Sequence, residues 1–146
     1  MRKEKALLSA SAELTVSFYD IDPMNIAWHG NYFRFFEHAR CALMDKIDYN
    51  YPQMEATGYG WPIVDSRLKY IGPARLHQKI IVEAHLAEFE NRMKVNYVIR
   101  DKESGKVLHK AYTIQVAVSM ETGEMQFRSP DILFEKLAAV GVELEQ

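Results

Sequence analysis

The chain has 146 residues, of which 48% are hydrophobic, and this size and composition predict one domain with a substantial core. Its 18 basic and 20 acidic residues are mixed along the sequence and give a net charge of −2, which argues against a broad nucleic-acid-binding face. The single cysteine, Cys41, excludes an internal disulfide and favours a reducing compartment. The apolar run at Leu7 and Leu8 is too short for a signal peptide, and no stretch reaches transmembrane length. We therefore expect a cytoplasmic protein without a membrane span.

The first half of the chain predicts one strand followed by the longest helix. Leu14, Val16 and Phe18 alternate with polar residues, as in a half-buried strand. The apolar residues of segment 31–48 recur at helical spacing opposite a charged side, which predicts a long and largely buried helix. Segment 53–57 predicts a loop or a single helical turn.

The second half predicts an antiparallel sheet. Four stretches alternate between apolar and polar residues and are separated by short turns: 63–70, 80–86, 93–100 and 108–118. Residues 125–127 predict a brief further pairing. Ser129, Pro130 and Asp131 predict the N-cap and first turn of a last helix that stops at Gly141. Because strands joined by short turns pair antiparallel and one long helix can cover one face, we expect an α+β fold of about five strands.

Two carboxylates, Asp20 and Asp22, lie in the loop directly before the predicted long helix. A helix N-terminus presents unpaired N–H groups that stabilise negative charge, so this arrangement suits acyl transfer. We expect Asp20 to cap the loop, with a part in catalysis as the alternative, whereas capping and catalysis both remain open for Asp22 on residue chemistry alone. Glu37 precedes Arg40 by three residues, which predicts a helical ion pair, with a catalytic carboxylate as the alternative. The five histidines show no spacing typical of a metal site.

Three segments match one family signature: residues 20–23 with 26–32 (Asp-Ile-Asp-Pro, then Ile-Ala-Trp-His-Gly-Asn-Tyr), residues 37–40 (Glu-His-Ala-Arg), and residues 69–75 (Lys-Tyr-Ile-Gly-Pro-Ala-Arg). In these segments the sequence resembles the 4-hydroxybenzoyl-CoA thioesterase family, in its YbgC-type branch. Two positions depart from the pattern. Asn25 stands where the family has glycine, and Asn accepts a positive φ at modest cost. His77 stands where an acidic residue is frequent.

The resemblance implies a hot-dog fold, in which a curved antiparallel sheet wraps around one long central helix, as a single domain spanning residues 1–146. It implies hydrolysis of an acyl thioester, usually an acyl-CoA, without a metal or organic cofactor. It also implies at least a homodimer, often a tetramer built as a dimer of dimers, with active sites at the dimer interface.

Site residues follow from the resemblance position by position. Asp22 matches the catalytic carboxylate, as nucleophile or as general base, and His29 matches the position whose backbone N–H polarises the thioester carbonyl. The residues expected to bind substrate are Asn25, Trp28, Asn31 and Tyr32 around the loop and helix start, with Arg92 and Arg128 at the CoA phosphates. At such spacing, aromatic residues such as Trp28 and Tyr32 lie in the core more often than not.

Three alternative functions remain open. The same hydrolysis could act on acyl-carrier-protein thioesters, because both carriers present a pantetheine arm. A hot-dog dehydratase acting on 3-hydroxyacyl thioesters would pair a His29 base with Glu37, although the Asp20–Pro23 loop argues against it. A non-catalytic acyl-thioester binder would keep the fold and the pocket. Neither the acyl group nor the choice between dimer and tetramer follows from the sequence.

Overall fold

The period-two stretches form one curved antiparallel sheet in the order β1-β4-β5-β6-β3. The computed structural model describes residues 4–144. The strands are β1 (Leu8–Thr15), β3 (Ile63–Tyr70), β4 (Lys79–Glu88), β5 (Met93–Asp101) and β6 (Val107–Gln115), and a separate two-stranded ribbon joins β2 (Tyr59–Gly60) to β7 (Val118–Ser119). The predicted α+β sheet of about five strands is confirmed. Among the described residues β3 pairs only with β6, so it forms one edge of the sheet.

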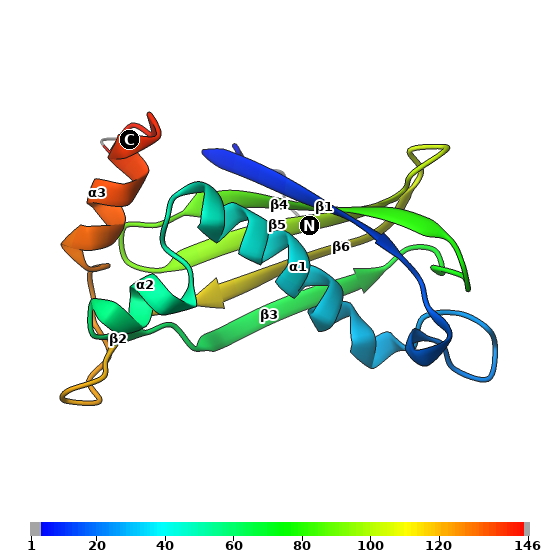
Figure 1. Ribbon diagram of the computed structural model, residues 1–146, viewed down its shortest axis with the longest axis horizontal. Helices are drawn as coiled ribbons and strands as arrows, with labels where there is room; N and C mark the ends of the chain where they lie inside the picture. Colours follow the sequence, from blue (N-terminus) through cyan, green and yellow to red (C-terminus); the bar gives the residue numbers. More distant parts are fainter. Residues whose placement is uncertain (1–3, 145–146) are drawn as a thin grey trace.

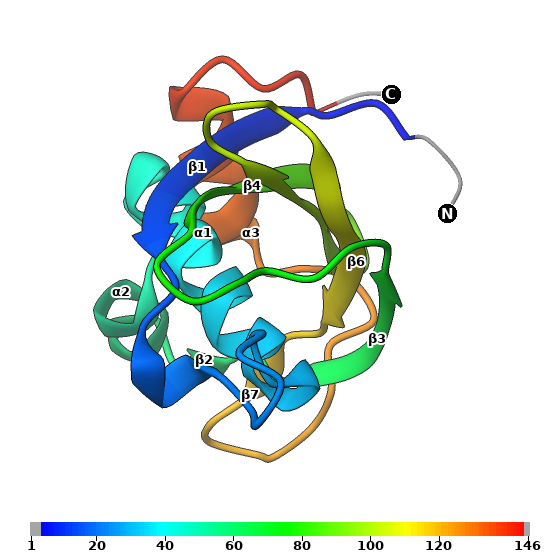
Figure 2. The same cartoon turned by 90° about the vertical axis from the view of Figure 1, so that its right-hand side faces the viewer.

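The long helix α1 (Tyr32–Lys46) lies against the concave face of the sheet, which curls around it (Figures 1 and 2). Phe36, Ala39 and Leu43 on this helix are fully or almost fully buried, because they face the apolar inner residues of β4 and β5. Two 3-10 turns precede it, η1 (Phe18–Asp20) and η2 (His29–Asn31), and two shorter helices follow, α2 (Tyr51–Ala56) and α3 (Asp131–Ala139). No helix within residues 4–144 is long and apolar enough to cross a membrane. The expected arrangement of a sheet around one central helix is confirmed.

Two local predictions at element ends are wrong. The first strand stops at Thr15, and Phe18 begins a turn with its side chain 77% exposed, because the Asp20 carboxylate accepts the Ser17 N–H at 2.8 Å and bends the chain. The last helix begins at Asp131 without a Ser129 cap, because the Ser129 hydroxyl donates to the Phe89 carbonyl instead.

The strand predicted over 108–118 is also shorter than expected. β6 ends at Gln115, and Val118 belongs to β7, which makes the expected brief pairing with Met125. Short helix α2 was predicted only as a loop or single turn. Asn50 caps it by accepting the N–H of Tyr51 at 2.8 Å, and Pro52 sits in its first turn.

One buried residue of the core is a histidine without a hydrogen-bond partner. His109 on β6 is fully buried, and neither ring nitrogen bonds to any atom of the described chain. Its ring stacks on Tyr32 at 4.3 Å between centroids and meets the edge of Tyr70 at 4.7 Å. Burial lowers the pKa of His109 to about 4, because a charged imidazole cannot be solvated there. The residue is therefore neutral at physiological pH.

This burial predicts a stability loss in mild acid. Between pH 8 and pH 5 the unfolded chain binds a proton at His109 that the folded chain does not accept until its pKa of about 4. The free energy of unfolding should therefore fall by about 2 kcal/mol over this range on account of His109. In His109→Phe this contribution should be absent, measured as the pH 8 minus pH 5 difference in urea unfolding.

The matched control is His38→Gln, which removes an exposed histidine from α1. Its pH difference should equal that of the wild type. An unchanged pH difference in His109→Phe would contradict a neutral His109 in the folded state. Because the comparison is between pH values within each variant, any packing cost of the phenylalanine cancels.

Candidate active site

A buried aspartate shapes the loop before α1. Asp20 is 2% exposed, and its carboxylate accepts the Ser17 N–H and forms an ion pair with Arg34 on α1. Its backbone carbonyl accepts the Trp28 N–H at 2.9 Å and the Asn31 side-chain amide at 2.7 Å. Asp20 therefore ties both ends of the loop to the helix. The expectation that it caps the loop is confirmed.

The second carboxylate sits at the tip of the same loop. The Asp22 N–H donates to the Ile26 carbonyl at 2.9 Å, and the Asp22 carbonyl accepts the Asn25 N–H at 3.0 Å, so residues 22–26 close a tight turn. Asn25 has φ of 61°, which agrees with the positive φ expected there. The Asp22 side chain is half-buried, and Oδ1 accepts the Met24 N–H at 2.8 Å. Its second oxygen accepts no hydrogen bond from residues 4–144.

The start of the helical segment offers two free donors. η2 begins at His29, and within the described part of the chain neither the His29 N–H nor the Gly30 N–H donates a hydrogen bond. The Tyr70 hydroxyl donates to the His29 carbonyl at 2.7 Å, which fixes this peptide to the edge strand β3. Free N–H groups at a helix start stabilise negative charge. The His29 backbone is thus available for the role predicted for it.

The indole of Trp28 covers this helix start. A Cβ atom added to Gly30 would come within 2.3 Å of the Trp28 ring, so glycine is what allows the indole to lie there. The Trp28 and His29 rings are 4.9 Å apart, and Trp28 remains 48% exposed. Trp28 therefore lies on the surface beside the free donors, as a pocket-lining residue would.

Asn31 and Tyr32 are engaged elsewhere. The Asn31 amide donates to the Asp20 carbonyl, so it holds the loop. Tyr32 is 2% exposed and belongs to the core, where it stacks on His109 and meets the edge of Tyr70 at 5.1 Å. In this chain both residues support the helix start, and the substrate-binding role expected for them stays a prediction.

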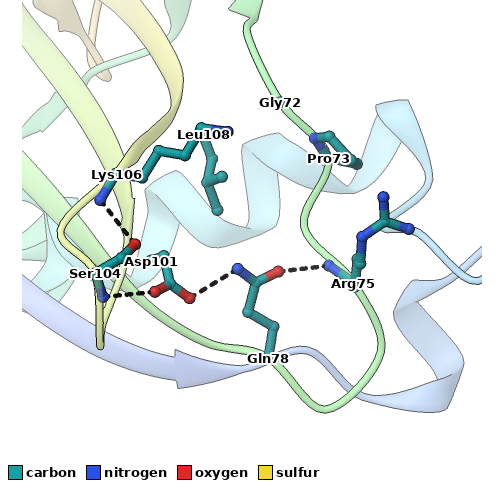
Figure 3. A pocket seen from close by; sticks show the side chains of 8 residues that line it. All are labelled: Gly72, Pro73, Arg75, Gln78, Asp101, Ser104, Lys106 and Leu108. Carbon is teal, nitrogen blue, oxygen red and sulfur yellow. Dashed lines mark hydrogen bonds between the residues drawn. The ribbon is translucent and has the colours of Figure 1, made fainter.

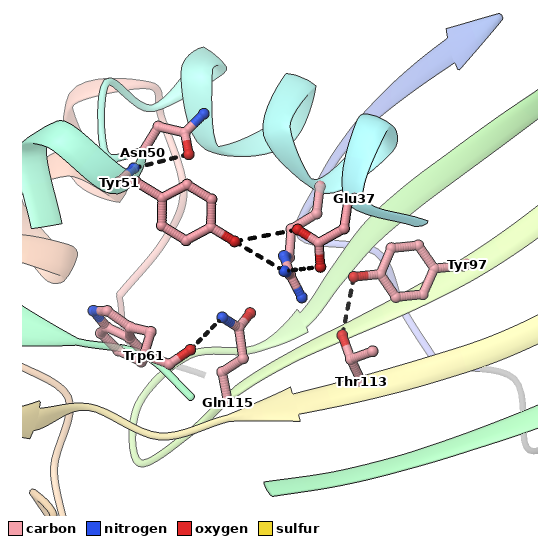
Figure 4. Close-up of polar contacts among 8 residues, drawn as sticks. Glu37, Asn50, Tyr51, Trp61, Tyr97, Thr113 and Gln115 are labelled. Atoms are coloured by element: carbon pink, nitrogen blue, oxygen red, sulfur yellow. Dashed lines mark hydrogen bonds and ion pairs between the residues drawn. The ribbon is translucent and has the colours of Figure 1, made fainter. Parts of the chain in front are cut away.

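Glu37 lies in a polar cluster under the middle of α1. It forms the expected ion pair with Arg40, and the Tyr51 hydroxyl donates to its second oxygen at 3.2 Å (Figure 4). Arg40 is 5% exposed and also donates to the Tyr51 hydroxyl at 3.1 Å. Both oxygens of Glu37 are therefore occupied, and nothing in the described chain links this carboxylate to His29.

The two arginines expected at CoA phosphates lie on neighbouring segments, far from the loop. The Ser129 N–H donates to the Glu90 carbonyl at 2.7 Å, which places the segment of Arg128 beside the hairpin of Arg92. This hairpin follows β4 at the end of the sheet where β3 begins, whereas His29 contacts the other end of β3. Eight residues of strand span about 26 Å. Arg92 pairs with Glu88 and Arg128 with Asp131.

Residue patterns did not single out Tyr70, Arg34 or His109, which support the helix start. Tyr70 lies in segment 69–75, which resembles the family, and this was the sequence feature that could have identified it as a site residue. Its contact depends on how β3 aligns with α1, which no local pattern encodes. Among residues 4–144 no three His, Cys, Asp or Glu side chains gather as metal ligands.

Comparisons with known proteins identify the family. A family model described as the thioesterase-like superfamily matches residues 16–140. The provisionally named acyl-CoA thioesterase YneP of Bacillus subtilis (strain 168) is 26% identical over 117 residues, which cover 80% of this chain and 85% of YneP. The DHNA-CoA thioesterase of Staphylococcus aureus superposes with a TM-score of 0.80 at 23% identity, covering 90% of each chain.

A further solved structure is a mutant 4-hydroxybenzoyl-CoA thioesterase in complex with 4-hydroxybenzoyl-CoA. It superposes with a TM-score of 0.77 at 18% identity, and the match covers 88% of this chain and 98% of the other. Together with the sheet order and the central helix, these similarities establish the hot-dog fold. Because the family model spans most of the chain, the protein belongs to the thioesterase-like superfamily.

Proposed function

We propose that this protein is a cytoplasmic acyl-CoA thioesterase, which hydrolyses the thioester bond to a free acid and CoA. The observation that carries the proposal is the pair of free backbone N–H groups at His29 and Gly30, directly after the loop that presents Asp22. Thioester hydrolysis needs donors for the oxyanion that develops on the carbonyl and a group that delivers the attacking oxygen. The names of YneP and of the two solved structures support an acyl-CoA substrate.

Asp22 can act in two ways. As general base it takes a proton from water, whose oxygen attacks the carbonyl carbon; the C–S bond then breaks and the thiolate leaves as CoA. As nucleophile its carboxylate oxygen attacks directly, releases CoA and forms an anhydride that water cleaves. In both routes the oxyanion accepts the His29 N–H. The half-buried Asp22 carboxylate keeps one oxygen free of hydrogen bonds within residues 4–144, as either route requires.

The geometry gives less support to the dehydratase alternative. It would need His29 as a base oriented by Glu37, but Arg40 and Tyr51 occupy both Glu37 oxygens. The exposed His29 ring instead lies beside the Trp28 indole. Hydrolysis therefore remains the reaction that the loop and helix start support best.

The complete site requires a second copy of the chain. β3 pairs with β6 on one side, and within residues 4–144 its other side has no partner strand. It also carries exposed apolar side chains, including Ile63 at 39% and Val64 at 56%. An open apolar edge of this kind favours pairing with another strand. If two copies pair antiparallel through β3, the start of one strand lies beside the end of the other. The Arg92 and Arg128 end of the partner would then approach the Asp22 loop.

Exposed apolar residues support this pairing. They gather near the two ends of β3: Phe18, Met24 and Trp28 at the loop, and Met120, Met125 and Phe127 beside β7. A two-fold axis through β3 brings these two groups together, and a pairing of identical surfaces closes on itself. We therefore favour a homodimer, with a dimer of dimers as a larger assembly.

Asp22→Asn tests the reaction. Asparagine keeps the side-chain oxygen that accepts the Met24 N–H, so the loop should persist while the base or nucleophile is lost. Free-thiol release from short-chain, medium-chain, long-chain and aromatic acyl-CoA should fall by at least about 10²-fold. The control Asp45→Asn removes an exposed carboxylate from α1 and should leave the rate unchanged. Full activity of Asp22→Asn would refute the assignment. If the wild-type protein hydrolyses none of the CoA or carrier-protein thioesters, the non-catalytic binding protein becomes the favoured function.

Gly30→Ala tests the helix start. The added Cβ collides with the Trp28 ring, so the indole must leave its place beside the free donors. We expect kcat/KM to fall by about tenfold, as water gains access to the N–H groups. In a Trp28→Ala background the same substitution should have no further effect, because its collision partner is gone. Equal effects in the two backgrounds would place the cause outside this contact.

Mixed dimers test the assembly. An Asp22→Asn chain and an Arg92→Gln/Arg128→Gln chain should each be weakly active alone. If each site takes its aspartate from one copy and its arginines from the other, a mixed dimer contains one wild-type site. In a one-to-one mixture that reassorts at random, half of the dimers are mixed and each has one of its two sites intact, so mixing should restore about a quarter of the wild-type activity. No recovery on mixing, with mixed dimers confirmed by mass, would show that both groups act within one chain.

A further inference from the structure

A hollow of about 400 Å³ lies at the loop end of the sheet, between the connection after β3 and the β5–β6 hairpin. Its lining residues are Gly72, Pro73, Arg75, Gln78, Asp101, Ser104, Lys106 and Leu108 (Figure 3). Arg75 projects from the connection and Lys106 from the hairpin, so the two cations come from facing segments. The hollow is separate from the Asp22 tip and from the arginines at the far end.

Neither cation is neutralised by the protein. Within residues 4–144, Arg75 and Lys106 form no ion pair, whereas the arginines and lysines on β5, in its hairpins and on the helices are mostly paired with carboxylates. Both side chains are exposed at the rim of the hollow. Unpaired cations on two walls of a concave site raise the local potential and attract anions.

The outer face of the sheet beside the hollow adds further positive charge. Lys69 on β3 lies directly opposite Lys110 on β6, and Arg67 lies two residues before Lys69 on the same face. None of the three forms an ion pair with a described residue. Like charges directly opposite each other destabilise a sheet. An anionic ligand would relieve this repulsion, which makes the arrangement typical of a binding surface.

The single acid of the hollow is already occupied. Asp101 accepts the Gln78 amide at 2.8 Å and the Ser104 N–H at 2.7 Å, and these hydrogen bonds lower its pKa. The side-chain oxygen of Gln78 in turn accepts the backbone N–H of Arg75 at 2.8 Å, so one hydrogen-bond network joins the two walls of the hollow. Figure 3 shows the Arg75 guanidinium directed away from the Asp101 carboxylate and from Lys106, so the flexible Arg75 side chain would turn toward the hollow to contact a bound anion. An anion at Arg75 and Lys106 can therefore bind without displacing this network.

The wall of the hollow is bonded to the candidate catalytic loop. The Leu76 N–H donates to the Asn25 carbonyl at 3.1 Å, and Ala74 accepts the Ala27 N–H at 2.7 Å. Arg75 itself pairs with Ile26 as an isolated bridge. A ligand in the hollow would thus lie one strand spacing, about 5 Å, from the segment that carries Asp22.

We propose that this hollow binds a phosphate ester through Arg75 and Lys106, with Arg67, Lys69 and Lys110 extending the positive surface. Arginine and lysine side chains on facing walls suit a doubly charged phosphate, which accepts charge-assisted hydrogen bonds from both. The phosphate could belong to the nucleotide end of the CoA substrate or to a separate phosphorylated effector. Only the first source rests on the proposed function; the site itself does not.

Direct binding tests the site without reference to catalysis. Adenosine 3′,5′-bisphosphate and pyrophosphate are titrated into the full-length protein by calorimetry, at low and at moderate salt. Arg75→Gln/Lys106→Gln should weaken binding by at least about tenfold, because two charge-assisted contacts are lost. The control Lys46→Gln/Lys136→Gln removes the same charge from α1 and α3 and should bind as the wild type does. Equal binding by the wild type and the Arg75/Lys106 variant, or no binding by either, overturns the site.

Enzyme kinetics then identify the source of the phosphate. If the nucleotide end of CoA occupies the hollow, adenosine 3′,5′-bisphosphate competes with acyl-CoA, and the double variant raises KM while kcat is retained. If a separate effector occupies it, the bisphosphate changes kcat at saturating acyl-CoA, and the variant abolishes that change. Binding that depends on Arg75 and Lys106 in a protein without thioesterase activity would refute the proposed function while supporting the site.

Discussion

The candidate site depends on one buried charge, the carboxylate of Asp20. A buried carboxylate is stable only when its partners are all in place, because an unpaired one costs several kcal/mol. Here Arg34 and the Ser17 N–H supply those partners, and the Asp20 carbonyl binds Trp28 and Asn31. Losing one of these partners would leave the buried charge underpaired, which favours the loop conformation seen here. That conformation leaves Asp22 at the tip and the His29 N–H unpaired.

Aromatic packing fixes the same helix start from the opposite side. Tyr32 stacks on His109, and Tyr70 packs against both while its hydroxyl binds the His29 carbonyl. The His29 carbonyl therefore has a hydrogen-bond donor, whereas the His29 and Gly30 N–H groups have no acceptor among the described residues. A donor held rigid before substrate arrives needs no reorganisation when charge develops, which is what the proposed oxyanion role requires. His109 contributes by shape, since burial keeps it neutral.

Periodic features of the sequence predicted the fold well, and features that depend on distant contacts escaped prediction. The alternating stretches and the helical spacing of 31–48 depend on burial of one face, which neighbours in sequence encode. Phe18 was wrongly placed in the first strand because the Asp20 carboxylate accepts the Ser17 N–H and bends the chain. Ser129 was wrongly predicted as a helix cap because its hydroxyl donates to the distant Phe89 carbonyl. Asp22, Asn25 and His29 came from a family resemblance. Tyr70 and His109 meet only through the register of β3 with β6, which no local pattern reveals.

Under the proposed function, the arrangement of charge would leave a single chain with an incomplete site. The Asp22 loop and the arginine pair lie at opposite ends of β3, farther apart than one loop could span, and both carry exposed apolar side chains. A monomer would leave this surface and a strand edge open to non-specific pairing. Antiparallel pairing of two β3 strands covers the edge and brings opposite ends together by symmetry. The fold would then use one interface both to prevent aggregation and to assemble the site, so stability and activity should depend on the same surface.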